Sequence, residues 1–360
     1  MSNKPLARPI AIVDEVRCRK NIKNMVEKAT KSNTVLRPHF KTHQSLEIGR
    51  WFREHGVTGI TVSTPEMARY FAKDGWDDIT LAFPFYPGQV EDVMELQKSC
   101  DIRLFVSDVE TVSFVEKNLE KPIKILIEAD AGYNRSGTAD LTKIDTIIHA
   151  AKSSKFVQFY GFYSHDGDTY KVKGKKQIKD KVERNYSLFA QLKEKYPNAK
   201  FCIGDTPSCC VMDDFRMVDE ISPGNFIFFD WMQTNIGSCS INEIGLLVKV
   251  PIAQLKEKSD QLIVHGGAVH LSKDCITVDG VQTYGQPVYF DEDLIKPIPG
   301  AYVTSLSQEH GIIQGAKQVI PHINSDNSVW ICPVHSCLTA NLFGHYQTST
   351  GTTIEKKILS

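Results

Sequence analysis

Short apolar runs alternate with amphipathic stretches from about residue 34 to residue 221, and this alternation limits the fold more than any other feature of the chain. The apolar runs predict buried strands, and stretches such as 109–118 and 141–153 have the apolar spacing of helices. About eight strands separated by helices predict a (β/α)8 barrel of the TIM type. A doubly wound sheet is the alternative, but no glycine-rich dinucleotide turn follows the first strand. The predicted strands are the run from Thr34 and residues 57–62, 79–82, 102–106, 123–129, 157–163, 201–203 and 217–221.

From about Gly237 onward the pattern changes to short β-like runs broken by glycine, proline and charged turns. We expect an all-β second domain there. The predicted domains are therefore a barrel over residues 14–236 and a β domain over residues 237–360 that also takes in residues 1–13.

The charge and cysteine content narrow the class of partner. The 42 lysine and arginine residues nearly balance the 43 aspartate and glutamate residues, which gives no electrostatic footprint for nucleic acid or an anionic membrane. No apolar run approaches the length of a signal peptide core or a membrane span. The nine cysteines lack paired spacing, which is typical of a reducing compartment. We expect a cytoplasmic protein that acts on a small molecule.

The segment RPHFKTHQ places Lys41 between His39 and His43 at the end of the first barrel strand. Burial and a nearby cation such as Arg37 would lower the pKa of a lysine and expose the lone pair that Schiff-base chemistry needs. The alternative is a solvated lysine among other basic residues, and this segment alone does not decide between them.

Other predicted strands of the barrel also end in polar residues, at the edge where barrel enzymes carry their active sites. The 123–129 strand leads into EADAGYNRSG, which contains Arg135, and the 157–163 strand leads into YSHDGDTY, which contains Tyr163 and His165. The last two strands end in GDTPS and SPGN, whose glycines, hydroxyls and exposed amides suit a phosphate. Each of these two segments is also compatible with an ordinary turn. A reactive lysine on the first strand together with phosphate loops on the last strands favours an aldehyde cofactor tethered by its phosphate.

The segment PVHSC contains His335 and Cys337 two positions apart. If it lies on a strand, both side chains point to the same face and could share a divalent metal, most naturally zinc. Two core residues that share this spacing by chance are the alternative.

Together these segments resemble those of fold-type III pyridoxal phosphate enzymes, in the group of metal-dependent D-threonine aldolases and D-serine dehydratases related to alanine racemase. The similarity covers nearly the whole chain, and the order of RPHFKTH and PVHSC is its specific part. EADAGYNRSG resembles the arginine loop of the family, GDTPS and SPGNF its phosphate loops, and LSQEHG a late family segment. Ser164 stands where the family usually has glycine, which leaves the roles of Tyr163 and His165 open.

The resemblance implies that Lys41 holds pyridoxal 5'-phosphate as a Schiff base and that His335 and Cys337 bind a divalent metal, with zinc, manganese and magnesium as candidates. It places His165 in catalysis and implies a homodimer. It also assigns cofactor contacts to six further residues, namely His39, Arg135, Tyr163, Thr206, Gly224 and Asn225.

The activity implied is that of a lyase acting on a D-amino acid with a β-hydroxyl group. Aldolase members tend to carry a carboxylate two residues after the metal-binding histidine, and Cys337 therefore favours dehydration to a 2-oxo acid and ammonia. Retro-aldol cleavage to glycine and an aldehyde is the alternative. An amino-acid racemase would need a second base that we cannot assign, and a non-catalytic pyridoxal phosphate carrier would not need a β domain.

Overall fold

The structure is a computed structural model that describes residues 4–357. The chain forms two compact units, of which one is Ile22–Gly224 and the other combines the residues through Asn21 with those from Asn225 onward. The predicted domains, 14–236 and 237–360 with 1–13, follow the same order along the chain, although their boundaries lie several residues away. Residues 1–3 and 358–360 of that prediction lie outside the described part.

The Ile22–Gly224 unit is built on an eight-stranded parallel sheet in the order β2-β9-β8-β7-β6-β5-β4-β3. His39 forms a parallel bridge with Thr61, and the Phe40 N–H donates to the Thr61 carbonyl at 2.8 Å, so the two outer strands approach and nearly close the sheet. This confirms the predicted barrel. The strands are β2 (Val35–Leu36), β3 (Gly59–Val62), β4 (Asp78–Pro84), β5 (Asp101–Val106), β6 (Ile123–Glu128), β7 (Val157–Ser164), β8 (Lys200–Ile203) and β9 (Glu220–Ile221).

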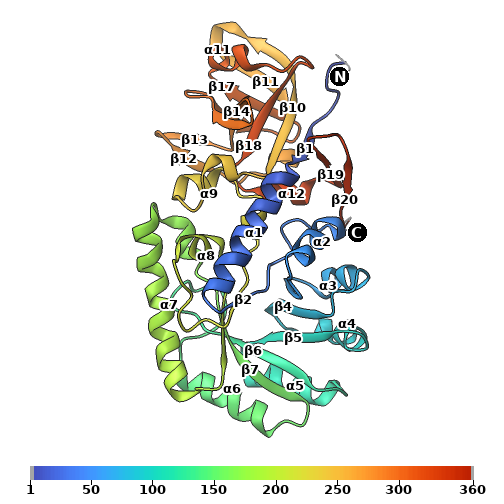
Figure 1. The fold of residues 1–360 in the computed structure, drawn as a ribbon, viewed down its shortest axis with the longest axis vertical. Coiled ribbons are helices and arrows are strands. Elements are labelled where there is room, and N and C mark those ends of the chain that lie inside the picture. The colour runs from blue at the N-terminus through green and yellow to red at the C-terminus, as the bar shows by residue number, and fades with distance from the viewer. Residues whose placement is uncertain (1–3, 358–360) are drawn as a thin grey trace. The chain divides into compact units, whose positions relative to one another are not determined.

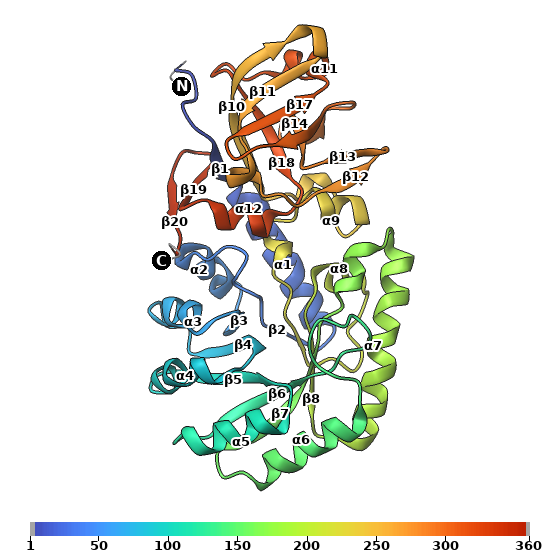
Figure 2. The same cartoon turned by 180° about the vertical axis from the view of Figure 1, so that it is seen from behind.

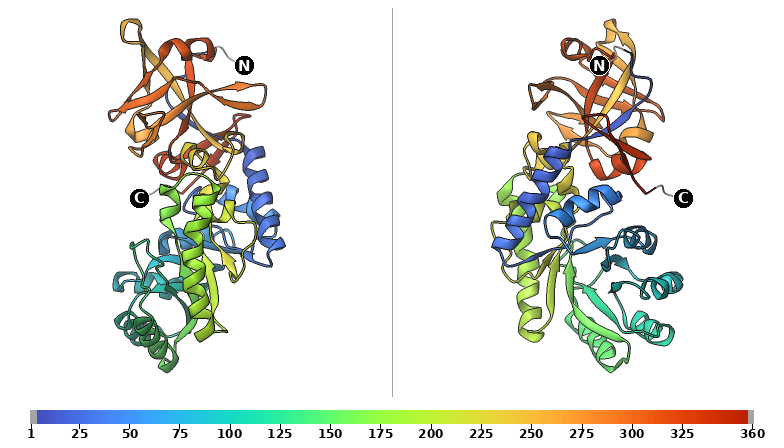
Figure 3. Two further views of the ribbon diagram at one scale, coloured as in Figure 1. Left: turned by 90° about the vertical axis from the view of Figure 1, so that its left-hand side faces the viewer. Right: turned by 45° about the vertical axis from the view of Figure 1, so that its right-hand side comes forward.

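Helices α3 to α7 cover the outer side of these strands (Figures 1 and 2), and the long α7 runs beside the barrel in both views of Figure 3. Hydroxyl and carboxylate side chains begin several of them: Thr64 accepts the Met67 N–H, and Asp108 accepts the Thr111 N–H. The helices are α1 (Glu15–Lys31), which spans the boundary between the units, α2 (Leu46–Glu54), α3 (Pro65–Ala72), α4 (Val90–Leu96), α5 (Val109–Asn118), α6 (Leu141–Ser153), α7 (Lys175–Lys195) and α8 (Thr206–Val211).

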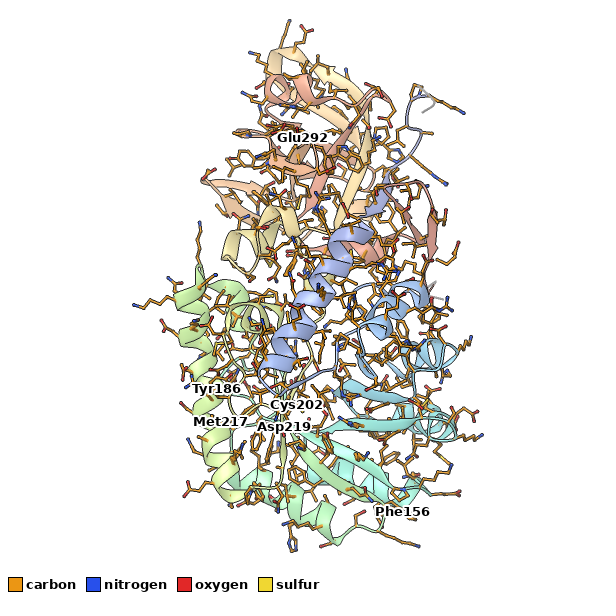
Figure 4. The ribbon with its side chains drawn as sticks, viewed as in Figure 1. Phe156, Tyr186, Cys202, Met217, Asp219 and Glu292 are labelled. Atoms are coloured by element: carbon orange, nitrogen blue, oxygen red, sulfur yellow. The ribbon has the colours of Figure 1, made fainter. Side chains whose placement is uncertain are left out.

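A buried ion network crosses the interior of the barrel. The Glu220 carboxylate accepts from Arg37 Nε at 3.1 Å and from Arg103 Nη1 at 2.8 Å, and Asp78 binds Arg37 at 2.6 Å. Burial would raise the pKa of Glu220, but the two guanidinium groups outweigh it and hold that pKa below its ordinary value. From the sequence we expected Arg37 to act as a nearby cation that lowers the pKa of Lys41. The structure pairs Arg37 with Glu220 and Asp78, which balance its charge. Cys202, which Figure 4 labels together with Asp219, lies in this buried layer with its Sγ 3.7 Å from Glu220.

A ten-stranded mixed sheet forms the second unit, with a path in the order β15-β14-β18-β10-β1-β19-β20 and with β11, β16 and β17 joined beside it. Residues 10–13 supply β1, which pairs with β10 on one side and with β19 on the other. The strands are β1 (Ile10–Val13), β10 (Leu246–Lys256), β11 (Gln261–His265), β14 (Gly285–Asp291), β15 (Leu294–Pro297), β16 (Tyr302–Leu306), β17 (His310–Gln314), β18 (Ser328–Pro333), β19 (His345–Thr348) and β20 (Thr353–Glu355), and β12 (Ile276–Val278) pairs with β13 (Val281–Thr283) as a separate hairpin.

Short α-helices interrupt this second unit, which the sequence analysis expected to be all β. Each is too short to show the apolar period of a helix, so the pattern of the sequence does not reveal it. They are α9 (Trp231–Ile236), α10 (Ala268–Leu271), α11 (Ala316–Val319) and α12 (Ser336–Leu342).

Within residues 4–357, no helix combines the length and the apolar character needed to cross a lipid bilayer.

Candidate active site

Lys41 lies in a turn just beyond β2, at the carboxyl end of the barrel strands. Its side chain is exposed, whereas the residues on either side of it, Phe40 and Thr42, are buried. The expectation that Lys41 itself is buried was therefore wrong. The buried flanks anchor the turn and leave the amine accessible to an incoming molecule.

The two histidines that flank Lys41 have different environments. The ring of His43 is buried among aromatic side chains, with its centroid 4.4 Å from that of Phe40, and its Nδ1 accepts the Ser45 N–H at 3.1 Å. His39 is also buried, and charged groups at the strand ends act on it electrostatically. Burial is the largest cause that lowers the pKa of His39 well below its ordinary value, and the charges of Lys41 and His165 lower it further. The imidazole is therefore neutral.

His165 follows β7 and donates its Nδ1–H to the carbonyl of Gly204. Burial, together with the charge of Arg135, lowers the pKa of His165 to about 3. The imidazole is therefore neutral, and its Nε2 is the nitrogen available to accept a proton. The charge of Lys41 also acts on His165, so the structure brings these two predicted residues into one electrostatic environment.

Tyr163 is buried in the barrel interior, where its ring centroid lies 4.6 Å from that of Phe105 and its hydroxyl lies 3.4 Å from the Gly204 carbonyl. Ser164, which replaces the usual glycine of the family, donates its hydroxyl to Asn185 of α7 at 2.9 Å. The serine side chain thus points to the helix layer. Although serine replaces the usual glycine at position 164, the neighbouring Tyr163 and His165 therefore stay on the barrel side.

Arg135 lies in the loop after β6, with half of its side chain exposed and with Nη2 3.7 Å from Glu128. Its charge acts on both His39 and His165. Arg135 is thus a half-exposed cation whose charge acts on the two neutral histidines, suited to an anionic group.

Two hydroxyls at the end of β8 are buried without a hydrogen-bond partner among the described residues, Thr206 Oγ1 and Ser208 Oγ. Buried polar atoms normally have partners, so a pair without them suggests an absent ligand with several acceptors. Asp205 holds the segment by accepting from the Ser208 N–H at 2.8 Å and from the Thr169 hydroxyl at 3.0 Å. Burial raises the pKa of Asp205 to about 6.

Gly224, in the loop after β9, must be glycine for steric reasons. A Cβ at this position would lie 2.9 Å from the His39 carbonyl oxygen and 2.9 Å from Thr42 Oγ1. The loop can therefore pack against the turn that carries Lys41 only without a side chain. Gly204 is equally constrained, because a Cβ there would lie 1.8 Å from the Tyr163 hydroxyl.

His335 and Cys337 lie at the start of α12, not on a strand as we expected. Strand β18 ends at Pro333, and His335 is the N-cap residue of the helix that begins at Ser336. The side chains of His335 and Cys337 are nevertheless in contact. Burial would lower the pKa of His335, but its contacts with Asp274 and Cys337 raise it to about 11. Its Nδ1 lies 2.8 Å from Asp274 Oδ2, which leaves Nε2 as the nitrogen that can coordinate a metal.

Asn225 directs its side chain to this same segment. Its Nδ2 donates to Asp230 at 2.6 Å, to Ser336 Oγ at 3.0 Å and to Cys337 Sγ at 3.5 Å. Asp230 also accepts the Ser336 N–H at 2.9 Å. The Asn225 side chain thus contacts the segment that carries Cys337, and its predicted contact with phosphate stays a prediction.

Asp230 and Asp274 could not be assigned from the sequence. They act on Ser336 and His335 across long sequence separations, which no local pattern reveals. Ser208 belongs to the GDTPS segment, whose hydroxyls we connected with a phosphate from the sequence.

Two family descriptions match the chain. The family "Alanine racemase, N-terminal domain" matches residues 13–230, and "Putative serine dehydratase domain" matches residues 246–349. A D-serine dehydratase of Dictyostelium discoideum is 29% identical over 95% of this chain and 93% of its own length. A D-threonine aldolase of Arthrobacter sp is 23% identical over 86% of this chain and 81% of its own length.

The fold is also similar to that of a solved D-threo-3-hydroxyaspartate dehydratase from Delftia sp. HT23. That structure has a TM-score of 0.87 and 26% identity, and the match covers 99% of this chain and 98% of the other.

Proposed function

The chain belongs to the family with an alanine racemase N-terminal domain, and we propose that it is a pyridoxal-phosphate- and metal-dependent lyase that dehydrates a D-amino acid with a β-hydroxyl group. The observation that supports dehydration over aldol cleavage is the contact of His335 with Cys337, because dehydratase-like members are expected to have a histidine and a cysteine at these positions. Relatives named D-serine dehydratase and D-threo-3-hydroxyaspartate dehydratase support this choice, since both cover 95% of the chain.

The residues at the barrel strand ends fit pyridoxal phosphate. The hydroxyls of Thr206 and Ser208 have no hydrogen-bond partner among residues 4–357, and Gly224 lets its loop pack against the turn that carries Lys41. We assign the phosphate to this group, together with the backbone at Asn225. Lys41 would hold the aldehyde, with His39, Arg135 and Tyr163 around it.

The second unit offers a donor set that suits a cation. His335 Nε2 and Cys337 Sγ are ligands that zinc prefers, and Asp274 orients the imidazole from its other nitrogen. A similar solved D-threo-3-hydroxyaspartate dehydratase with a cysteine replaced is described as a metal-free form, which indicates that this relative can bind a metal. We propose zinc, with manganese and magnesium as alternatives.

When bound, pyridoxal phosphate supplies an electron sink for charge at Cα, and the divalent ion polarises the β-hydroxyl. Once the substrate amine has replaced Lys41 at the aldehyde, the released Lys41 Nζ would take the Cα proton. Arg135 offers its exposed guanidinium to an anionic group, and neutral His165 accepts a hydrogen bond or proton at Nε2. Loss of the proton and the hydroxyl, followed by hydrolysis, yields a 2-oxo acid and ammonia.

Retro-aldol cleavage is the second candidate, favoured by the similarity to a D-threonine aldolase. In that reaction His165 Nε2 would take the proton of the β-hydroxyl, and the products would be glycine and an aldehyde.

Two further assignments belong to the proposal. We expect a homodimer, as the family resemblance implies. We also expect a cytoplasmic location, because the nine cysteines lack the paired spacing of a disulfide framework, as is usual in a reducing compartment.

The test is an end-point assay of the cofactor-loaded protein with D-serine, D-threonine and D-threo-3-hydroxyaspartate, before and after chelation. We expect 2-oxo acid and ammonia that disappear when the metal is removed. Glycine plus aldehyde would establish the aldolase instead, and the absence of both products would contradict a lyase.

Lys41→Ala should abolish both the absorbance of bound cofactor and turnover, whereas the exposed lysine variant Lys31→Ala should change neither. Cys337→Ala should keep the cofactor absorbance but lose turnover. Full activity in the Lys41 or Cys337 variant would refute the role assigned to that residue.

A further inference from the structure

Three side chains outside the site described above gather in the second unit. His265 ends β11, His270 lies in α10, and Glu309 lies in the turn between β16 and β17. One ring nitrogen of each histidine and one carboxylate oxygen of Glu309 lie within 4.8 Å of one another. Glu309 belongs to the LSQEHG segment, which takes no part in the site described above.

Backbone contacts hold the three segments together. The Gly266 N–H donates to the Glu309 carbonyl at 3.0 Å, and the Ala268 N–H donates to the Ser307 carbonyl at 2.8 Å. Gly267 permits this approach, because a Cβ there would lie 2.3 Å from the Gln308 carbonyl oxygen. The donors therefore project from backbone that is already in place, which lowers the entropic cost of binding an ion.

The spacing of the donors suits a small divalent ion. Zinc bonded to nitrogen and oxygen at about 2.0–2.1 Å in a tetrahedron holds its ligands roughly 3.4 Å apart. His265 Nε2 and Glu309 Oε2 are 3.3 Å apart, so this pair is already at that separation. A side-chain rotation that moves the His270 ring nitrogen by at most about 1.4 Å would complete the set, since none of the three separations exceeds 4.8 Å and the tetrahedral spacing is roughly 3.4 Å. Two histidines and one glutamate are a ligand set of zinc enzymes.

The state of His270 is hard to explain without a ligand. Its Nδ1 is buried and has no hydrogen-bond partner within the described part of the chain. Burial, and after it His265, lowers the pKa of His270, which keeps the imidazole in the neutral form that binds metals. The His265 and Glu309 side chains are 41% and 49% exposed and could form an ordinary surface ion pair, whereas the cluster adds a second imidazole, that of His270, within the same 4.8 Å.

We propose that His265, His270 and Glu309 form a second divalent-metal site that binds Zn2+ and shares no residue with the His335–Cys337 pair. An ion there would fasten α10 to the β16–β17 turn. The segment that follows α10 carries Asp274, which contacts His335, and Leu271 at the end of α10 accepts a hydrogen bond from Thr339 of α12 at 3.1 Å. The second ion is thus a structural support for the segment that orients His335.

Zinc titration of the full-length, chelator-treated protein tests this proposal. We expect the parent protein to bind two equivalents and His335→Ala to retain one. Adding Glu309→Gln to His335→Ala should remove the remaining equivalent. His310→Ala is the matched control, because His310 is exposed and lies directly opposite His265 in the strand register but does not belong to the cluster. It should still bind two.

Cobalt gives an independent readout. In Cys337→Ala, Co2+ should produce visible ligand-field bands without a thiolate charge-transfer band, and His270→Ala should abolish the bands that remain. Circular dichroism checks that each variant folds, and Glu309→Gln changes only an exposed side chain. The proposal is overturned if His335→Ala binds no zinc, or if Glu309→Gln and His310→Ala bind zinc equally.

Discussion

Replacing Asp274 should weaken metal binding at His335 without removing a ligand. Asp274 Oδ2 lies 2.8 Å from His335 Nδ1, so its charge holds the ring with Nε2 available for the metal. Losing such a partner of a metal-binding histidine typically costs about 10–100-fold in affinity. The side chains of His335 and Asp274 are 28% and 34% exposed, and solvent therefore screens part of the interaction.

We therefore expect Asp274→Asn, which keeps an oxygen acceptor but loses the charge, to cost about 10–30-fold, or about 1.4–2 kcal/mol. Asp274→Ala removes the acceptor too and should approach about 100-fold, or about 2.7 kcal/mol. The assay is competition for Zn2+ with a chromophoric chelator. Measuring every variant in a Glu309→Gln background restricts the result to the His335–Cys337 pair.

Asp279→Asn is the control, because it removes the same charge from an exposed carboxylate in the adjacent β12–β13 hairpin, where Asp279 accepts from the Tyr302 hydroxyl at 3.0 Å. Its zinc affinity should equal that of the background protein. If Asp274→Asn and Asp279→Asn have the same affinity, Asp274 does not orient His335 and the reasoning fails.

Three further perturbations test other parts of the structure. Glu220→Gln should lower the free energy of unfolding in urea by about 3–5 kcal/mol, because two buried guanidinium groups lose their shared carboxylate, and a loss under about 1 kcal/mol would contradict this. Asp205 has a pKa raised by burial to about 6, so the folded protein keeps this proton to a higher pH than the unfolded chain does and loses stability as the pH rises from about 4 to about 6. Asp205→Asn should remove the contribution of this group to the pH dependence of stability and gain up to about 3 kcal/mol at pH 7, seen as urea unfolding curves that shift less between pH 4 and pH 6 than those of the parent protein. Gly224→Ala should weaken pyridoxal phosphate binding in a spectrophotometric titration, since the new Cβ meets the His39 carbonyl oxygen, while Gly344→Ala, with no atom within 4 Å of its Cβ, should not.

The barrel could be predicted because its signal is local. The helices 109–118 and 141–153 match the structure at both ends, as α5 and α6, since their apolar residues recur with the helical period and Asp108 and Asp140 precede them as caps. The rule that parallel barrels present function at the carboxyl ends of their strands then placed Lys41, Arg135, His165 and Thr206 near one another.

The candidate metal segment shows where that reasoning stops. PVHSC was compatible with a strand, and two residues in alternation on a strand share a face. The structure instead ends β18 at Pro333 and starts α12 at Ser336, whose N–H is accepted by Asp230 from a distant part of the sequence. A helix of this length has too little periodic pattern to reveal itself and depends on that tertiary contact.

The sequence by itself determined the order of strands and helices in the barrel, the β character of the second unit and the residue types available for chemistry, because periodicity and turn chemistry act between neighbouring residues. Only the tertiary structure decided that Arg37 pairs with Glu220, that Lys41 is exposed, and that Asp274 reaches His335. Burial, charge pairing and pKa depend on which distant residues share one environment, and a chain shows this only once it is folded.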